Sequence, residues 1–582
     1  MSRTLDYDLV RGRRDLIAGL TVAAIALPQG MAYALIAGVD PKFGVYSAIV
    51  VTAIASIFGS SSHLINGPTS AISLLVFSSL AFIDPENRTD LFEALFLLGV
   101  LVGVIQILIS VFKLGDLTRY ISESVIVGFM VAAAFLLALG QLGNALGVKD
   151  RGNGNMQVLY RTWLTLFHGD AINYRAVVLS VTAVVGAVVL RKLVQRFGLP
   201  QIDMLTVLII TALIAYVAGW STTGHNGKTA VSITGKIPAS LPAPHIPIVH
   251  TDWLPHLSQG ALAVAFIGLI EALSIAKAIA HQTQQKIDYN RQILAEGLAN
   301  LIGGFFQSLP GSGSLSRSAI NHQSGAATRF SGIVAAATVA AALLLFAPLL
   351  GYIPKAALAG LLLVTAVRLV DFRRLVYTVK ASRYDAGLVI ITAITGVAVD
   401  LDKAVLLGVA LSILLFVPRA SKLKVSELVV TSDRVVRERV SGEPDDPQVL
   451  IYDVEGELFF GAAPDLEQSL DRLTERVKTE DTRFVVLRLK RARNPDAVGI
   501  ERIEHFLRDL TALEVTVLLA GVRPDTLDLL SNIGLRQWFP DEHIFPEEDK
   551  EYSATLKAVR YAQSKLADGD DARDDAELYY LV

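Results

Sequence analysis

The stretch SLPGSGSLSRSAINHQSG, Ser308–Gly325, lies between two long apolar runs. It opens with Pro, Gly and Ser, which interrupt helices, and continues as a short helix that carries Arg317 among small residues. A broken apolar segment with one cation and free backbone amides is a typical anion site of a membrane protein. The stretch therefore predicts an anion site, provided that the surrounding chain spans a membrane.

The composition supports a membrane protein with a soluble part. The chain has 582 residues, of which 52% are hydrophobic and 18% charged, and its charges are sparse up to about Arg419 and dense afterwards. This pattern predicts a large membrane domain followed by a soluble domain. The net charge of −3 gives no support for nucleic-acid binding, and the absence of Cys excludes disulfides and thiolate chemistry.

Apolar windows without Asp, Glu, Lys or Arg, together with a short segment after Pro310, predict about fourteen helical membrane segments. Basic residues gather in alternate loops, for example in Arg368–Arg383, whereas Ser221–Asp252 carries only two lysines. The positive-inside rule then places both termini in the cytoplasm. We expect a multi-pass protein of the bacterial inner membrane, without a cleavable signal at its basic start.

The chain after the membrane part alternates short β-branched strands with amphipathic helices, which predicts a small α/β domain. Within it, Val449–Gly456 and Glu457–Ala462 are expected to form a hairpin. The stretch Asp568–Glu577 carries six acids and one Arg, and this tail is predicted to be disordered. The expected divisions are residues 1–14 as a cytoplasmic N-terminus, 15–420 as the transmembrane domain, 421–566 as the cytoplasmic α/β domain, and 567–582 as the acidic tail.

A second broken segment, HLINGPTSAIS at His63–Ser73, matches the opening stretch in outline. Asn66–Pro68 interrupts the chain, and a short helix then begins with small residues whose amides are free. Two such elements in two halves of a chain indicate an inverted-repeat transporter, with two positive helix ends at one site. Taken alone, each is equally consistent with a tight packing turn. The candidate contacts at the two helix starts are Thr69, Ser70, Ala71, Ser314, Leu315, Ser316 and Arg317.

Near the N-terminus, Ala26–Ser47 contains a helix interrupted by Pro28 and Gly30. Gln29 and Tyr33 present polar groups there, so they are candidates for lining the same site. An ordinary kinked helix with Tyr33 at an interface explains the pattern equally well.

Glu271 lies in the run LIEALSIAKAIAHQ. If its helix starts after Pro255, the carboxyl lies inside the span, where ionisation is costly, and it becomes a candidate for binding a coupling proton. If it lies nearer the cytoplasmic end, it is solvated or salt-bridged instead. Lys277, six residues later, faces another side of the helix and need not pair with it.

The soluble part offers no enzyme site. Lys490–Gly499 connects a strand to a helix and is a candidate docking loop, but it contains no acid–base pair, nucleophile triad or metal cluster. We therefore expect a protein that is not an enzyme and needs no cofactor or metal.

Four motifs, PQGMAYALIAGVDPKFGVYSA, INGPTSAIS, LIEALSIAKAIA and PGSGSLSRSAIN, resemble the SulP family of anion transporters, and the soluble part resembles its STAS domain. The resemblance implies fourteen segments in a seven-plus-seven inverted repeat, divided into a core and a gate domain. It places the substrate between the third and tenth segments, at Pro68–Ala71 and Ser314–Arg317, with Gln29 and Tyr33 lining the pocket. It also implies an elevator-type mechanism and a homodimer.

Two departures from the family pattern bear on regulation and coupling. Hydroxyl residues that hold Na⁺ follow the acidic residue of the eighth segment in the sodium-coupled bicarbonate transporter, whereas Glu271 here is followed by Ala272, Leu273, Ser274 and Ile275. This favours proton coupling or exchange over Na⁺ symport. The STAS turn that is phosphorylated in some relatives is Asp496–Gly499 here and has no hydroxyl, which favours a scaffolding or dimer role.

We expect a secondary transporter of sulfate or a related inorganic anion, by proton symport or anion exchange. Bicarbonate and C4-dicarboxylates are alternative substrates, because backbone amides and helix dipoles select charge and size. A membrane-anchored sensor or scaffold, whose STAS domain binds a cytoplasmic protein, is the alternative from another class, and a channel is a third.

Overall fold

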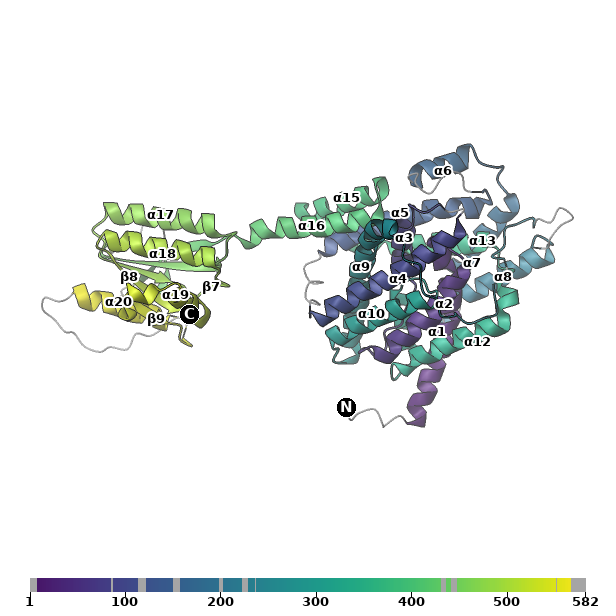
Figure 1. Ribbon diagram of the computed structural model, residues 1–582, viewed down its shortest axis with the longest axis horizontal. Coiled ribbons are helices and arrows are strands. Elements are labelled where there is room, and N and C mark those ends of the chain that lie inside the picture. The colour runs from purple at the N-terminus through teal and green to yellow at the C-terminus, as the bar shows by residue number, and fades with distance from the viewer. Residues whose placement is uncertain are drawn as a thin grey trace. The chain divides into compact units, whose positions relative to one another are not determined.

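The computed structural model describes residues 8–84, 87–113, 122–149, 158–197, 203–221, 229–235, 237–430, 436–440, 447–550 and 552–566. The chain divides into two compact units, Met1–Ser412 and Ile413–Val582 (Figure 1). The predicted acidic tail, 567–582, and the first half of the predicted N-terminal segment, 1–7, lie outside the described residues.

The first unit is helical, because its sequence is a series of apolar runs separated by short polar turns. The helices of its first half are α1 (Leu9–Ile36), α2 (Pro41–Phe58), α3 (Ser70–Ser79), α4 (Arg88–Val111), α5 (Glu123–Leu146), α6 (Val158–Phe167), α7 (Tyr174–Phe197) and α8 (Asp203–Val217). Those of its second half are η2 (Thr251–Trp253), α9 (Leu254–Thr283), α10 (Tyr289–Phe305), α11 (Leu315–Gln323), α12 (Phe330–Leu350), α13 (Lys355–Leu369), α14 (Phe372–Ala381), α15 (Arg383–Ala398) and α16 (Leu401–Ala420), which continues past Ser412. Among the described residues, seven helices are long and apolar enough to cross a bilayer, namely α1, α2, α4, α5, α7, α9 and α12.

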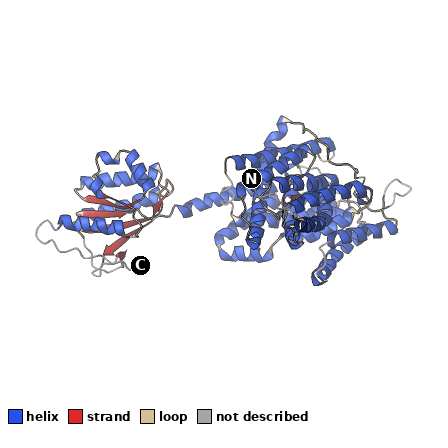
Figure 2. Ribbon diagram, turned by 90° about the horizontal axis from the view of Figure 1, so that it is seen from below, coloured by secondary structure: helices blue, strands red, loops and turns tan. Residues whose placement is uncertain are grey.

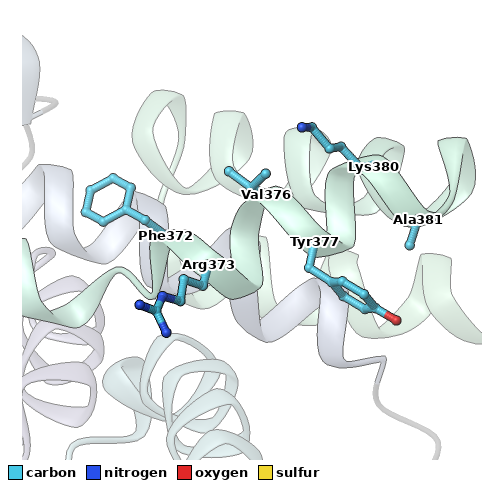
Figure 3. Close-up of a pocket in the computed structure, with 6 residues that line it drawn as sticks. All are labelled: Phe372, Arg373, Val376, Tyr377, Lys380 and Ala381. Carbon is cyan, nitrogen blue, oxygen red and sulfur yellow. The ribbon is translucent and has the colours of Figure 1, made fainter.

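Two features recur at the same place in each half. A two-residue strand, β1 (Asn66–Gly67) or β2 (Ser312–Gly313), precedes α3 or α11. A ten-residue amphipathic helix follows α5 and α13, as α6 and α14 respectively. The charge-free windows of the sequence do not predict these two helices, because basic residues such as Arg161 in α6 and Arg373 in α14 (Figure 3) interrupt the apolar runs.

The helix contacts repeat between the halves as well. α1 packs against α12 as α9 packs against α4, and α3 contacts α9 as α11 contacts α1. Helices α1–α4 pack with α9–α12 in one group, and α5–α8 pack with α13–α15 in another (Figure 1). Close approach depends on glycine, since a Cβ on Gly44 of α2 would collide with the Gly30 carbonyl oxygen of α1.

The second unit is an α/β domain, as the sequence predicts. Its strands are β3 (Lys424–Val430), β4 (Val436–Glu438), β5 (Val449–Glu457), β6 (Phe484–Arg488), β7 (Ala492–Arg493), β8 (Thr516–Val522) and β9 (Ile544–Pro546). Its helices are α17 (Ala463–Thr479), α18 (Ala497–Ala512), α19 (Pro524–Asn532), η3 (Leu535–Gln537), η4 (Asp541–His543) and α20 (Ser553–Leu566). The sheet order is β4-β3-β5-β6-β8-β9, with β5, β6, β8 and β9 parallel and β7 paired to β5.

Helices cover both faces of this sheet (Figure 2). Alternate residues of β6 face opposite sides. Val485 and Leu487 pack with α17, α18 and α19, whereas Phe484 and Val486 pack with α20. The central strands are buried on both sides, which explains their continuous apolar runs.

The predicted hairpin of Val449–Gly456 with Glu457–Ala462 is wrong. The first run continues to Glu457 as β5, which pairs antiparallel with β3 and parallel with β6, while the second run turns into α17 at Ala463. Its aromatic residues do not continue a strand, since Phe460 is exposed and its backbone N–H donates to Asp496 Oδ2 at 2.7 Å. A parallel neighbour needs a crossover helix, and α17 supplies it.

Candidate functional site

The two broken segments meet in the interior of the first unit. β1 and β2 pair antiparallel, with Asn66 opposite Gly313 and Gly67 opposite Ser312. Each strand leads directly into a short helix, so the pairing holds the N-terminal ends of α3 and α11 beside each other. This is the juxtaposition that the matching sequence elements predict.

The start of α3 is buried. Thr69 is its N-cap, and the Thr69 hydroxyl accepts a hydrogen bond from the Ile72 N–H at 3.4 Å. Ser70 and Ala71 are buried as well, and as first-turn residues they have no intrahelical acceptor for their N–H groups. The positive end of this helix therefore faces the protein interior.

The start of α11 is open by comparison. Ser314 is the N-cap and is buried, and its hydroxyl accepts the Arg317 N–H at 3.5 Å. Leu315 and Ser316 are exposed, with 61% of Leu315 accessible. Their backbone amides belong to the first turn, so the helix itself supplies no acceptor for these N–H groups.

Arg317 lies between the two helix starts and is 1% exposed. Its Nη2 donates to the Pro68 carbonyl oxygen at 2.9 Å, while Nε and Nη1 have no hydrogen-bond partner among the described residues. Gly67 makes room for it, because a Cβ there would approach Nη2 to 3.2 Å and the backbone φ is +138°. A buried guanidinium with unpaired donors is costly without a partner, and an anion is a partner that it can bind.

Glu271 lies beside the start of α3 and is partly buried. It is on α9, and its Oε2 accepts a hydrogen bond from the Thr69 hydroxyl at 3.2 Å. Arg317 and Tyr33 are close enough to interact with it electrostatically, although Arg317 forms no ion pair within the described part of the chain. The site thus combines one cation, one carboxyl and two helix ends.

Gln29 and Tyr33 line a small cavity between α1, α8 and α13, together with Met204, Leu361 and Thr365. The Gln29 Nε2 points to the Met204 sulfur at 3.8 Å, and its Oε1 has no partner among the described residues. The cavity lies where the two helix groups of the first unit meet.

The sequence analysis did not identify a row of three buried polar residues on α10. Gln292, Glu296 and Asn300 are each 1% exposed and recur at four-residue spacing, so they share one face of the helix. Asn300 fixes β2, because its Nδ2 donates to the Gly311 carbonyl at 3.0 Å and its Oδ1 accepts the Gly311 N–H at 2.8 Å. The four-residue spacing within QILAEGLAN, residues 292–300, is the signal that could have revealed this row.

In the second unit, the Asp496–Gly499 turn is a helix cap. Asp496 Oδ1 accepts the Gly499 N–H at 2.9 Å, and Oδ2 accepts the Phe460 N–H. Ala497 and Val498 supply no hydroxyl. Among the described residues, no group of three His, Asp or Glu side chains could hold a metal ion.

Both units of the chain match known protein families. Residues 13–392 match the model of the sulfate permease family, and residues 444–551 match the STAS domain. The Bacillus subtilis (strain 168) protein YvdB is 28% identical over 554 residues, covering 94% of this chain and 98% of its own. Sulfate transporter 4.1, chloroplastic, of Arabidopsis thaliana is 25% identical over 561 residues, covering 94% and 80%.

The fold matches that of the murine Solute Carrier 26 family member A9 anion transporter in the inward-facing state. The TM-score is 0.84 at 20% identity, covering 97% of this chain and 92% of that one. The helical first unit and the α/β second unit therefore form a multi-pass membrane domain followed by a STAS domain. The chain belongs to the sulfate permease family, a family of anion transporters and not of enzymes.

Proposed function

We propose that this protein is a secondary active transporter of a small inorganic anion, with sulfate as its first candidate, across the bacterial inner membrane. The observation that carries the proposal is Arg317, a buried guanidinium with two unpaired nitrogens between two helix N-termini. An anion placed there accepts hydrogen bonds from the Arg317 side chain and from the first-turn amides of α11. The other binding residues are the predicted set: Gln29, Tyr33, Thr69, Ser70, Ala71, Ser314, Leu315 and Ser316.

The membrane domain is proposed to contain fourteen segments in a seven-plus-seven inverted repeat, with α6 and α14 lying at the membrane surface. The repeated element order and the repeated packing of α1 with α12 and of α9 with α4 support this arrangement. We assign the transport domain to residues 15–420, the STAS domain to 421–566 and a cytoplasmic position to both termini.

The mechanism is proposed to be of the elevator type. α1–α4 with α9–α12 form the core, which carries β1, β2 and Arg317, and α5–α8 with α13–α15 form the gate. The small cavity beside Gln29 and Tyr33 lies where core and gate meet, and the core slides there to carry the anion across. A homodimer, with a STAS domain that binds a cytoplasmic protein, completes the proposal.

Coupling is proposed to use protons, by symport or exchange, with Glu271 as the proton-binding carboxyl. Glu271 accepts a hydrogen bond from Thr69, the N-cap of α3, so protonation of Glu271 affects the start of this helix. The residues after it supply only one hydroxyl, at Ser274, which favours protons over Na⁺.

An uptake panel in proteoliposomes tests the function. Sulfate, bicarbonate, chloride, succinate and fumarate are compared at two pH values, with and without Na⁺. We expect sulfate uptake that an inward proton gradient drives and Na⁺ does not change. Preferred bicarbonate or dicarboxylate uptake would reassign the substrate, conductance would indicate a channel, and no transport with tight protein binding would favour the scaffold.

The Glu271→Gln variant tests the coupling. Its amide keeps a hydrogen bond with Thr69 but cannot take up a proton, so we expect it to bind sulfate while losing gradient-driven uptake. Counterflow of labelled sulfate is the control for intact binding. Gradient-driven uptake equal to that of the wild type would exclude Glu271 from coupling.

A further inference from the structure

We propose that Glu296 is a second proton-binding carboxyl of the transport site, joined to β1 through Asn66. This inference rests on the proposed anion transport and adds a residue to it. Glu296 lies on α10, 1% exposed, on the face that carries Gln292 and Asn300.

Of the two carboxylate oxygens of Glu296, only Oε1 accepts a regular hydrogen bond. Gln292 Nε2 donates to Glu296 Oε1 at 3.1 Å, and the orientation of this amide is set because Gln292 Oε1 accepts the N–H groups of Ser60 and Ser61 at 3.0 and 3.2 Å. Glu296 Oε2 makes no hydrogen bond of regular geometry among the described residues. A buried carboxylate with one unsatisfied oxygen is costly, and a bound proton removes its charge.

Asn66 can serve both charge states of this carboxyl. Its side chain lies next to Glu296, yet neither Asn66 Nδ2 nor Glu296 Oε2 makes a hydrogen bond of regular geometry within the described structure. An amide can donate through Nδ2 to a carboxylate, or turn over and accept the acid O–H through Oδ1. Gain or loss of the proton on Glu296 therefore changes which orientation of the Asn66 amide is favoured.

Asn66 belongs to the stretch that builds the anion site. Its neighbour Gly67 borders Arg317, the Pro68 carbonyl accepts from Arg317, and Thr69 donates to Glu271. Two acids thus flank Asn66–Thr69 from opposite ends, Glu296 from α10 and Glu271 from α9.

Apart from Glu271, the groups that the described structure places around Glu296 carry no charge. α10 packs against α2, α4 and α9. α2 contributes Ser56 and Thr52 to the buried polar groups of this region, α4 contributes Gln106, which accepts from Asn300 Nδ2 at 2.9 Å, and α9 contributes Glu271, which interacts electrostatically with Glu296. Glu271 is therefore the titratable partner whose state influences Glu296.

The direction of the effect follows from linkage. An ionised Glu296 places a negative charge near the anion site and weakens anion binding, so a proton on Glu296 strengthens it, and a bound anion strengthens proton binding equally. The wild-type KM for sulfate is then expected to rise from acidic to alkaline pH. Glu296→Gln, which is neutral at every pH and nearly the same shape, is expected to keep a low KM at alkaline pH.

The experiment measures KM and maximal rate of sulfate uptake at about pH 6 and about pH 8, together with protons carried per sulfate. Relative to the wild type, Glu296→Gln is expected to show a smaller change in KM between the two pH values and to carry fewer protons per sulfate. Glu296→Asp, which restores a titratable group, is expected to recover the pH dependence of KM. A KM for Glu296→Gln that rises with pH in parallel with the wild type would overturn the inference.

Infrared spectroscopy of the purified full-length protein provides a second test that does not need transport. The C=O stretch of a buried protonated carboxyl is expected in the wild type and reduced in Glu296→Gln, with the variant as thermally stable as the wild type. An unchanged C=O band would also overturn the inference. If the wild type carries no anion but the band is lost in Glu296→Gln, the proposed function fails while the proton site on Glu296 stands.

Discussion

Among the described residues, each of the two units buries one arginine almost completely, Arg317 in the first and Arg488 in the second, and their surroundings differ. In the STAS domain, Arg488 is 0% exposed, its Nη1 donates to Asp453 Oδ1 at 2.7 Å, and its guanidinium lies 4.9 Å from the Tyr552 ring centre. In the membrane domain, Arg317 is equally buried but bonds only a carbonyl oxygen, and two of its nitrogens are unpaired among the described residues. One cation is neutralised by its own chain, and the other is not.

The difference is the one expected between a structural charge and a charge that binds substrate. Burying a cation is costly unless a partner compensates it. Asp453 supplies that partner permanently, so Arg488 joins neighbouring strands of the sheet. Arg317 instead lies beside two positive helix ends, with Glu271 as a nearby carboxyl, and under the proposed function a bound anion supplies the remaining compensation.

The largest expected effect is that of Arg317→Ala. Hydrogen bonds to charged groups contribute about 1.5–3 kcal/mol each, so losing them should weaken sulfate binding by at least about tenfold. Thermal stability should change little, because no internal salt bridge is lost. The measurements are sulfate binding and uptake in proteoliposomes.

Arg88→Ala is the matched control for this experiment, since Arg88 is exposed and pairs with Asp40 at 2.7 Å. Its uptake should equal that of the wild type. Wild-type sulfate affinity in Arg317→Ala would remove Arg317 from the site and end the distinction between the two arginines.

Asp453→Asn should produce the opposite pattern. Breaking a buried ion pair leaves an uncompensated charge and typically costs about 3–5 kcal/mol, so the STAS domain should unfold more readily. Denaturant-dependent hydrogen exchange of the β6 and β8 amides in the full-length protein measures this change. Sulfate affinity should not change. Unaltered exchange would show that Arg488 does not depend on Asp453.

Gly67→Ala probes the space around Arg317 and should have an intermediate effect. A Cβ at a backbone φ of +138°, 3.2 Å from Arg317 Nη2, strains the backbone by about 1–3 kcal/mol and displaces the guanidinium. We expect several-fold weaker sulfate uptake. Gly140→Ala is the control, because a Cβ on Gly140 meets nothing within 4 Å. Equal uptake by both variants would mean that the guanidinium position is not critical.

The smallest expected effect is on the pH dependence of STAS stability, through His543, whose neutral form is favoured by burial. His543 packs between Phe539 and Tyr561, and burial lowers the pKa of His543 below its ordinary value of 6.5. The unfolded chain therefore binds more protons between the lowered pKa and 6.5, and STAS stability should fall as the pH falls through this window. His543→Gln should flatten that slope in the same exchange experiment, and an unchanged slope would assign it to other groups.

Much of this protein could be predicted from local patterns. Apolar runs interrupted by Pro and Gly predict broken helices, because these residues disfavour helix continuation whatever surrounds them. That principle is enough to find the breaks at Asn66–Pro68 and Pro310–Gly313 and the helices that follow them. Periodicity likewise predicts the α/β character of the STAS domain, although not the partner of β5, since strand pairing depends on residues distant in sequence.

The tertiary structure alone determines the contacts between those pieces. The sequence by itself established that Arg317 is a cation at a helix start, but only the pairing of β1 with β2 places it against Pro68, 249 residues away, with Nε and Nη1 unpaired. It established that Glu271 is an acid in an apolar run, but only packing sets it against Thr69. The physical reason is that burial, hydrogen bonding and charge compensation depend on neighbours brought by folding, whereas helix breaks and apolar periodicity are properties of adjacent residues.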